Sequence, residues 1–499
     1  MADLEKSFDG FMNEYANALK AFFRKEENQK KVSLNRGIPS ELIRELQNHR
    51  PLRTFMPASA GGFGGHVHQS LRMLEVSSRE SLSLSLVMGI NGALFIQPVQ
   101  KYAQKEVSLS ILQKFRSGTV MGGLMITEPG YGSDALHMRS SYTKSHRGYH
   151  VTGIKHWGGL TGWADYWLLT AREKKADGTL ARDIDFFIHD AANPGLEVEE
   201  YYENLGLYML PYGRNRLNAL IPESMRLIPQ STGIKMMLDT LHRSRMQFPG
   251  MAAGFIRRLL DEAMAHCRKR QVGGKSLFSY DQVRDRIARI QSCFTACSAM
   301  CIYASEHVSV KKDLSLDDIP ANAIKTVITD MMQHVAQSYL QLTGAKGYRL
   351  DHLAGRSVVD SRPFQIFEGS NDILYQQIAE SFLKKMKKLK TPVLHDFLVQ
   401  YELTDKISGY LKNDTRFRLD SNLAQRKLVL LGKMLGKTVI ANMILNMADR
   451  GYSADHVQNS MEILLGDIRN LTASVCHNSI TDAALNRDQE HEWYQFLAI

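Results

Sequence analysis

The spacing of apolar residues divides the chain into helical and extended regions. In the first 120 residues, apolar side chains recur at helical spacing over residues 11–23, 39–48, 71–79 and 106–115. Between Val120 and about Ile228 the apolar runs are short, rich in aromatic and β-branched residues, and predict strands at 149–154, 165–170, 184–188 and 217–221. Long helical periodicity returns over residues 248–270, 279–307, 321–342 and 373–388.

These elements predict a mainly α protein with a central β domain. Because no long helix separates the strands, we expect a small barrel or sandwich rather than a parallel sheet. The four long helices after Gly233 are expected to form an antiparallel bundle. The domains are predicted as an N-terminal helical domain, a β-barrel, a four-helix bundle and an additional helical region, at residues 1–120, 121–230, 231–390 and 391–499.

Two further apolar stretches change this picture little. The uncharged residues 81–100 include several serines, an asparagine, glutamines and a proline, which favours a buried helix over a membrane span. Residues 428–447 carry an apolar stripe at helical spacing. We expect this stripe to pack on the bundle or to build a subunit interface.

Composition and charge narrow the classes of function. The net charge is +10, but Lys and Arg are interleaved with Asp and Glu, so we expect anionic small molecules rather than nucleic acid as partners. Three of the five cysteines, Cys293, Cys297 and Cys301, would share one helix face as buried thiols, with no histidine placed to complete a metal site. The N-terminus lacks the apolar segment of a signal peptide, and few cysteines fit a reducing compartment, so we expect a cytoplasmic protein.

The stretch FQIFEGSNDI, residues 364–373, contains the strongest candidate for chemistry. Glu368 stands between an aromatic run and a glycine, just before a predicted helix that Ser370 or Asn371 can cap. A carboxylate held against Phe364, Ile366 and Phe367 would be poorly solvated, which raises its pKa and suits a general base. The alternative is an exposed acidic residue that the helix dipole favours at this end of the helix.

Seven motifs in order resemble those of the acyl-CoA dehydrogenase family. They are MITEPGYGSD (125–134), GYHVTGIKHW (148–157), WADYWLLTAR (163–172), RSRMQFPGMAAG (243–254), RKRQVGGK (268–275), QLTGAKGY (341–348) and QIFEGSNDI (365–373). The resemblance implies a helical domain, a small β-barrel and a helical bundle. It also implies removal of two hydrogens across the α and β carbons of an acyl-CoA thioester.

The resemblance assigns the base to Glu368. In some members the base instead precedes the arginine of the first bundle helix, but that position here is Ser244, which cannot take the proton. Arg245 is the matching arginine and is expected to shape the substrate pocket beneath the base. Ser133 is expected to contact both the substrate and the cofactor.

FAD is the cofactor that the resemblance implies. One subunit is expected to contact it through Ile126, Thr127, Ser133, Trp157, Gly159, Ser370 and Asp372. In family dimers the neighbouring subunit contributes the residues that match Arg270, Gln341 and Gly344 here. We therefore expect a homodimer or homotetramer, with an electron-transfer flavoprotein or oxygen as the electron acceptor.

The chain also departs from the family pattern. Gly158 and Gly159 follow Trp157, where the family usually has an aliphatic residue and then a Ser or Thr whose hydroxyl bonds flavin N5. A backbone N–H at Gly159 could partly replace that hydroxyl. The run WGGL resembles acyl-CoA oxidases, as do FEGSN and the helical sequence after Pro392. An oxidase or monooxygenase on the same fold, or a scaffold that has lost FAD, are therefore the alternatives.

Overall fold

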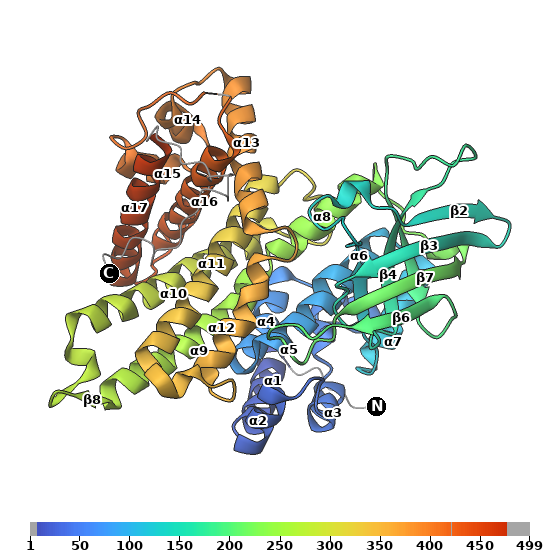
Figure 1. The fold of residues 1–499 in the computed structure, drawn as a ribbon, viewed down its shortest axis with the longest axis horizontal. Coiled ribbons are helices and arrows are strands. Elements are labelled where there is room, and N and C mark those ends of the chain that lie inside the picture. Colours follow the sequence, from blue (N-terminus) through green and yellow to red (C-terminus); the bar gives the residue numbers. More distant parts are fainter. Residues whose placement is uncertain (1–6, 421, 477–499) are drawn as a thin grey trace, which may run out of the picture.

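The N-terminal helices lie between the sheet and the long helices that follow it in the computed structural model, which describes residues 7–420 and 422–476 (Figure 1). Their side chains build one face of the common hydrophobic core; in the first helix the buried set includes Phe11, Tyr15 and Leu19, as the apolar spacing predicted. The helices are α1 (Phe8–Phe23), α2 (Glu26–Leu34), α3 (Ser40–His49), α4 (Val67–Glu80), α5 (Leu82–Gly89), α6 (Gln97–Tyr102) and α7 (Lys105–Arg116).

The uncharged stretch is a core helix with an irregular centre. Between α5 and α6 the backbone winds as a π-helix over Ile90–Ile96, a local form that is frequent at functional sites. Two helical segments are long and apolar enough to cross a membrane, Leu82–Tyr102 and Gln425–Ala448, but 94% and 67% of their apolar windows are buried in the fold. Both segments therefore serve as packed helices here.

The central domain is a curled seven-stranded sheet. Its strands are β1 (Gly122–Met125), β2 (Ser141–Ser145), β3 (Gly148–His156), β4 (Tyr166–Glu173), β5 (Asp185–Asp190), β6 (Leu196–Tyr201) and β7 (Gly213–Ile221). The order is β1-β4-β2-β3-β7-β6, with β5 also paired to β4; β4 runs parallel to β1 and β2, and the other pairs are antiparallel. The described strands β1 and β6 end this order without pairing to each other, so hydrogen bonds do not close the predicted barrel.

The bundle follows the sheet and carries the long predicted helices. It consists of α8 (Gly233–Arg245), α9 (Phe248–Lys269), α10 (Asp281–His307), α11 (Asp318–Thr343), α12 (Leu353–Ser361) and α13 (Asn371–Leu389). A short hairpin of β8 (Gln271–Val272) and β9 (Lys275–Ser276) joins α9 to α10 at the end farthest from the large sheet (Figure 1). Within α10, Cys293 and Cys297 are buried, and no His, Cys, Asp or Glu group among the described residues could hold a metal ion.

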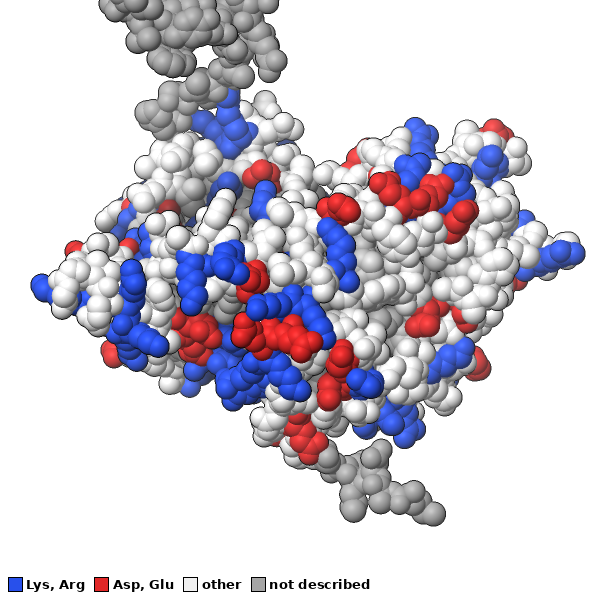
Figure 2. All heavy atoms as spheres, turned by 60° about the horizontal axis from the view of Figure 1, so that its bottom comes forward, with Lys and Arg blue, Asp and Glu red and all other residues white. Residues whose placement is uncertain are grey.

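The C-terminal region packs on this bundle. It contains α14 (Leu394–Gln400), α15 (Asp405–Ser408), α16 (Gln425–Ala448) and α17 (Ala454–Cys476). Helix α16 lies against α10, α11 and α13, so the apolar stripe has a partner within the same chain. The contact is close at Gly432, where an added Cβ would lie 1.8 Å from the carbonyl oxygen of Tyr375. On the face shown in Figure 2, basic and acidic side chains are interleaved, in line with the sequence pattern.

Candidate functional site

Glu368 lies in the short loop that connects α12 to α13, against aromatic side chains. The Phe364 and Phe367 rings are 4.9 Å apart, and both approach Phe248 of α9, at 5.8 and 6.0 Å between centroids. The expectation for Ile366 was wrong, because this side chain is 57% exposed. Phe248 of α9 packs against the two rings instead. The loop turns sharply here, with φ of 53° at Glu368 and 92° at Gly369.

One oxygen of the Glu368 carboxylate accepts a hydrogen bond, and the other has no partner in the described part of the chain. The Ser244 hydroxyl donates a hydrogen bond to Oε1 at 2.8 Å. The Oε2 atom is buried and has no hydrogen-bond partner in the described part of the chain. Burial raises the pKa of Glu368, while the Ser244 hydrogen bond and the charges of Arg245 and Lys325 oppose this rise. The direction agrees with the expectation from the sequence and leaves Oε2 as the atom that can accept a proton.

Ser370 begins the next helix but does not cap it through its side chain. It occupies the N-cap position of α13, and its hydroxyl makes no capping hydrogen bond. Asn371 is buried and binds elements of α11 instead, with its amide nitrogen 2.7 Å from Asp330 Oδ1. The helix start is therefore fixed by contacts with α11 rather than by the predicted cap.

Arg245 supports the backbone of the loop that carries Glu368. Its Nε and Nη2 atoms both donate to the carbonyl oxygen of Glu368, at 3.0 and 2.7 Å, and Nη1 donates to Asn322 Oδ1 at 2.7 Å. Burial lowers the pKa of Arg245 to about 10, so the guanidinium is still charged at neutral pH. These three contacts show a loop anchor, and the expected contact with substrate stays a prediction.

The sheet contributes an aromatic wall on the other side of the site. Trp157 is 53% exposed, has a φ of 54°, and its ring lies 4.6 Å from that of Tyr202 and 6.1 Å from that of Tyr212. A Cβ at Gly159 would lie 3.6 Å from Tyr212 Cε1. Burial, and to a smaller extent the charge of the Glu368 carboxylate, raise the pKa of the Tyr212 phenol.

The groups on this wall fit the flat, polar ring system of a flavin. Among the residues that the structure describes, no backbone carbonyl accepts a hydrogen bond from the N–H of the buried Gly159. Ser133 is exposed, and Ile126 and Thr127 follow β1 at the edge of the sheet, where the Thr127 carbonyl accepts from His156 N–H at 2.8 Å. An exposed indole beside such donors can cover a planar ring, as the sequence motifs implied.

The remaining candidates for FAD binding lie elsewhere in the chain. Arg270 ends α9 beside β8, at the bundle end remote from β3 and β7 (Figure 1). Gln341 and Gly344 are at the end of α11, in the same part of the bundle, because the Leu342 backbone and the charge of Arg270 both influence the pKa of His266 in α9. Asp372 is exposed and pairs with Lys433 of α16 at 3.8 Å. Arg270, Gln341 and Gly344 therefore lie at the bundle end that is away from the sheet.

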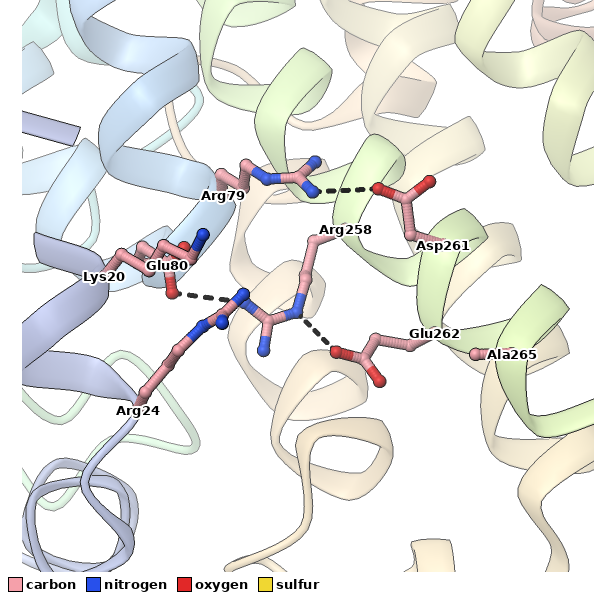
Figure 3. Close-up of a pocket in the computed structure, with 8 residues that line it drawn as sticks. All are labelled: Lys20, Arg24, Arg79, Glu80, Arg258, Asp261, Glu262 and Ala265. Carbon is pink, nitrogen blue, oxygen red and sulfur yellow. Dashed lines mark hydrogen bonds and ion pairs between the residues drawn. The ribbon is translucent and has the colours of Figure 1, made fainter. Parts of the chain in front are cut away.

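A surface cavity of about 300 Å³ is separate from this site. It lies between α1, α4 and α9 (Figure 3). It is crossed by ion pairs from Arg79 to Asp261 at 2.9 Å and from Arg258 to Glu80 and Glu262 at 3.1 and 2.9 Å. Arg258 is ten residues beyond Phe248 on α9, about 15 Å along the helix axis. The charged side chains that line this cavity are largely paired with each other, so we assign the cavity no part in the chemistry.

Three residues of the site were not predicted in the roles that the structure shows. Ser244 was considered only as a failed base, yet it donates to the carboxylate. Tyr212 stands in a loop without a recognised motif. Lys325 is the only charged residue in the otherwise uncharged run 319–329 of α11, and such an isolated charge was the available signal.

The helical layer, the curled sheet and the bundle, with a carboxylate whose Oε2 atom is buried and an exposed tryptophan on the sheet, agree with the class of flavin-dependent oxidoreductases that the motifs resemble. Three family models match the chain: the N-terminal, middle and C-terminal domains of acyl-CoA dehydrogenase, over residues 13–119, 123–220 and 231–383. Together they cover well over half of the sequence. The chain belongs to the acyl-CoA dehydrogenase family of FAD-dependent oxidoreductases, and the resemblance seen in the sequence is confirmed.

Individual relatives are distant. An acyl-CoA dehydrogenase of Bacillus subtilis is 24% identical over 67% of this chain and 87% of its own length. The mouse very long-chain specific acyl-CoA dehydrogenase is 23% identical over 76% of this chain but 58% of its own length, so this chain spans less than two thirds of that relative.

Solved structures confirm the fold. An acyl-CoA dehydrogenase of Bacillus anthracis complexed with FAD aligns with a TM-score of 0.76 at 18% identity, over 95% of this chain and 88% of its own. Butyryl-CoA dehydrogenase of Megasphaera elsdenii aligns at 0.66 and 20% identity, over 77% of this chain and all of its own. Because the Bacillus anthracis structure aligns over 95% of this chain, it also contains a region that matches the fold of the C-terminal helices.

Proposed function

We propose that the protein is an FAD-dependent acyl-CoA dehydrogenase in which Glu368 takes the α proton of an acyl-CoA thioester. The observation that carries the proposal is the Glu368 carboxylate: Ser244 holds Oε1, and Oε2 is buried without a partner among the described residues. A desolvated base is suited to a weakly acidic proton, because burial raises its affinity for that proton. When bound, FAD would supply the acceptor for the hydrogen that leaves the β carbon.

The chain's own residues then have definite roles. Glu368 Oε2 accepts the proton, while Ser244 keeps the carboxylate oriented and Arg245 keeps its backbone in place. The Glu368 N–H makes no hydrogen bond to a backbone carbonyl in the described chain and is free to donate to the thioester oxygen as negative charge develops there. Trp157 and the Gly159 N–H line the side on which the flavin would lie.

A second copy of the chain completes this proposal. Arg270 ends α9 at the bundle end that carries β8, and Gln341 and Gly344 are at the end of α11, so we expect these residues to meet the flavin of another subunit. A guanidinium suits a pyrophosphate because it is a planar, permanently charged fork. Sedimentation of the purified protein with FAD should show at least a dimer, and a monomer that retains FAD would contradict this arrangement.

The acceptor of the electrons is a separate question. The sequence WGGL favours an oxidase, and Gly159 cannot be replaced by the usual hydroxyl residue without displacing Ile90, since an added Cβ would lie 2.6 Å from Ile90 Cδ1. The alternative function is therefore an acyl-CoA oxidase. Hydrogen peroxide formed at every turnover in air would establish it, whereas slow reoxidation in air would favour an electron-transfer flavoprotein.

The test is an anaerobic absorption spectrum before and after addition of acyl-CoAs of several chain lengths. We expect the flavin band of the native protein to bleach with a subset of them. The Glu368→Gln variant should keep the flavin band but not bleach, because the amide cannot accept the proton. Glu262→Gln, in the remote cavity, is the matched control and should bleach as the native protein does. Unimpaired bleaching of Glu368→Gln would remove Glu368 as the base.

A further inference from the structure

A second buried cation, Lys325 of α11, lies behind the loop that carries Glu368. Its side chain is fully buried, and its Nζ atom donates to the carbonyl oxygen of Gly369 at 2.7 Å and to Asn371 Oδ1 at 2.8 Å. A buried ammonium group is unfavourable unless its hydrogen bonds are made. These two acceptors explain how the cation is tolerated, and the mechanism above gives it no role.

Lys325 and Arg245 hold two successive carbonyl groups. Arg245 donates twice to the Glu368 carbonyl, and Lys325 donates to the next one. Asn322, one helical turn before Lys325, accepts from Arg245 Nη1 at 2.7 Å. Helix α11 therefore fixes both cations, and together they fix the backbone where Glu368 and Gly369 adopt positive φ.

The charges around this loop influence one another. Arg245 from α8 and Lys325 from α11 both favour the ionised form of Glu368, and the Glu368 charge raises the pKa of the Tyr212 phenol, in the loop before β7. Lys325 is influenced in turn by Arg245, Glu368 and Asp330. Burial and Arg245 lower the pKa of Lys325 to about 7, so this side chain can change its charge near neutral pH.

We propose that Lys325 is a positioning residue for Glu368: its ammonium group holds the carbonyl of the neighbouring Gly369, and its positive charge favours the ionised form of the Glu368 carboxylate. The proposal rests on the role of Glu368 as the base. It assigns to α11 a part in proton transfer, although no α11 side chain contacts the Glu368 carboxylate among the described hydrogen bonds.

The experiment measures the protonation of Glu368 directly. Protein labelled with ¹³C-carboxyl glutamate is titrated by infrared difference spectroscopy, and the band lost in Glu368→Gln identifies Glu368. We expect Lys325→Met and Lys325→Gln to raise the Glu368 pKa by about one pH unit, because each removes a nearby positive charge. The acidic limb of the pH profile of flavin reduction should move by the same amount. Lys325→Gln should keep more of the plateau rate, because its amide can still donate to Gly369.

The control is another buried lysine of similar geometry. Lys101 is 4% exposed at its side chain and donates to Asp239 at 3.0 Å and to the Lys312 carbonyl at 2.8 Å. Lys101→Met removes a comparable buried amine without contacting the Glu368 loop, so it should lower stability without moving the Glu368 titration. An unmoved Glu368 titration in the Lys325 variants would overturn the proposal.

A reciprocal measurement leaves Lys325 in place and guards against variants that do not fold. Because coupling between two sites is reciprocal, Glu368→Gln should lower the pKa of Lys325 by as much as loss of Lys325 raises that of Glu368. The ¹⁵Nζ resonance of Lys325 reports this value, and an unchanged Lys325 titration would also overturn the proposal. Neither titration needs acyl-CoA. A native protein whose flavin no acyl-CoA bleaches would therefore refute the proposed function and leave the Lys325 result readable.

Discussion

Replacing Ser244 with alanine tests whether a single hydroxyl sets the working pH of the base. The Ser244 hydroxyl lies 2.8 Å from Glu368 Oε1 and lowers the pKa of a carboxyl that burial raises. A hydrogen bond to a charged group contributes about 1.5–3 kcal/mol. At about 1.4 kcal/mol per pH unit, its loss should raise the Glu368 pKa by about 1–2 pH units. Water that entered the space would recover part of the loss, so the lower figure is the expected one.

The assay is stopped-flow reduction of the flavin by a good acyl-CoA substrate, anaerobically and across pH. The base works only when ionised. Below both pKa values, Ser244→Ala should therefore be about tenfold slower for each pH unit by which the substitution raises the Glu368 pKa. Above both values the two rates should converge, because the carboxylate is then fully ionised in each protein. Ser298→Ala, which removes a hydroxyl that donates to the Phe294 carbonyl within α10, is the control and should not move the profile.

The result that would refute this reasoning is an acidic limb at the same pH in Ser244→Ala and in the native protein. A uniform loss of rate at all pH values would also count against it. A uniform loss of rate would mean that the Ser244 hydroxyl orients the carboxylate without stabilising its charge.

Two further expectations concern glycines at close contacts, with Gly466→Ala in α17 as their common control. Gly432→Ala should lower the melting temperature, because the new Cβ would lie 1.8 Å from the Tyr375 carbonyl at the α16–α13 contact. Gly466 has nothing within 4 Å of an added Cβ, so Gly466→Ala should stabilise the protein by up to about 1 kcal/mol. Equal melting temperatures of the Gly432→Ala and Gly466→Ala variants would contradict the packing described. Gly159→Ala should weaken FAD retention after gel filtration, since its Cβ would lie 2.6 Å from Ile90 Cδ1, and undiminished retention would show that this wall can yield.

The long helices were predictable because apolar residues recur at helical spacing along them, even where α9 and α11 are buried on every side. The expected ranges 248–270 and 279–307 correspond to α9 (Phe248–Lys269) and α10 (Asp281–His307) within two residues at each end. Two strands were not predicted because they lack a regular apolar pattern. Strand β6 has no fully buried residue, and β2 is polar along most of its length, so neither shows an alternating apolar pattern.

Strand β1 was not predicted because side chains from other elements fill the space that its own glycines leave empty. Its first two residues are glycines, which rarely indicate a strand. A Cβ at Gly122 would lie 2.4 Å from the Phe95 ring, and one at Gly123 would lie 2.5 Å from the Trp167 ring. The two aromatic residues come from other elements of the chain, so local sequence could not show that these glycines are part of the core.

The candidate site was predictable only in part, because its contacts join distant parts of the chain. Motifs pointed to Glu368 and Trp157, and the aromatic residues Phe364 and Phe367 pointed to a desolvated carboxylate. Ser244 stands 124 positions from Glu368, and Lys325 stands 44 from Gly369. Periodicity reports which face of a helix is buried but not which residue of another helix it meets, and for that reason the donors around the loop were missed.

The geometry of the base follows from a balance between backbone strain and buried charge. A non-glycine residue with positive φ costs about 1–3 kcal/mol, and Glu368 has a φ of 53°. Two hydrogen bonds from Arg245 and one from Lys325 hold the two carbonyls of this turn, each contributing about 1.5–3 kcal/mol because the donor is charged. Together they exceed the strain, and the two Arg245 hydrogen bonds alone, at about 3–6 kcal/mol, are sufficient to offset it. The second cation is therefore more than the turn requires, which is consistent with an electrostatic role for Lys325 beside the carboxylate.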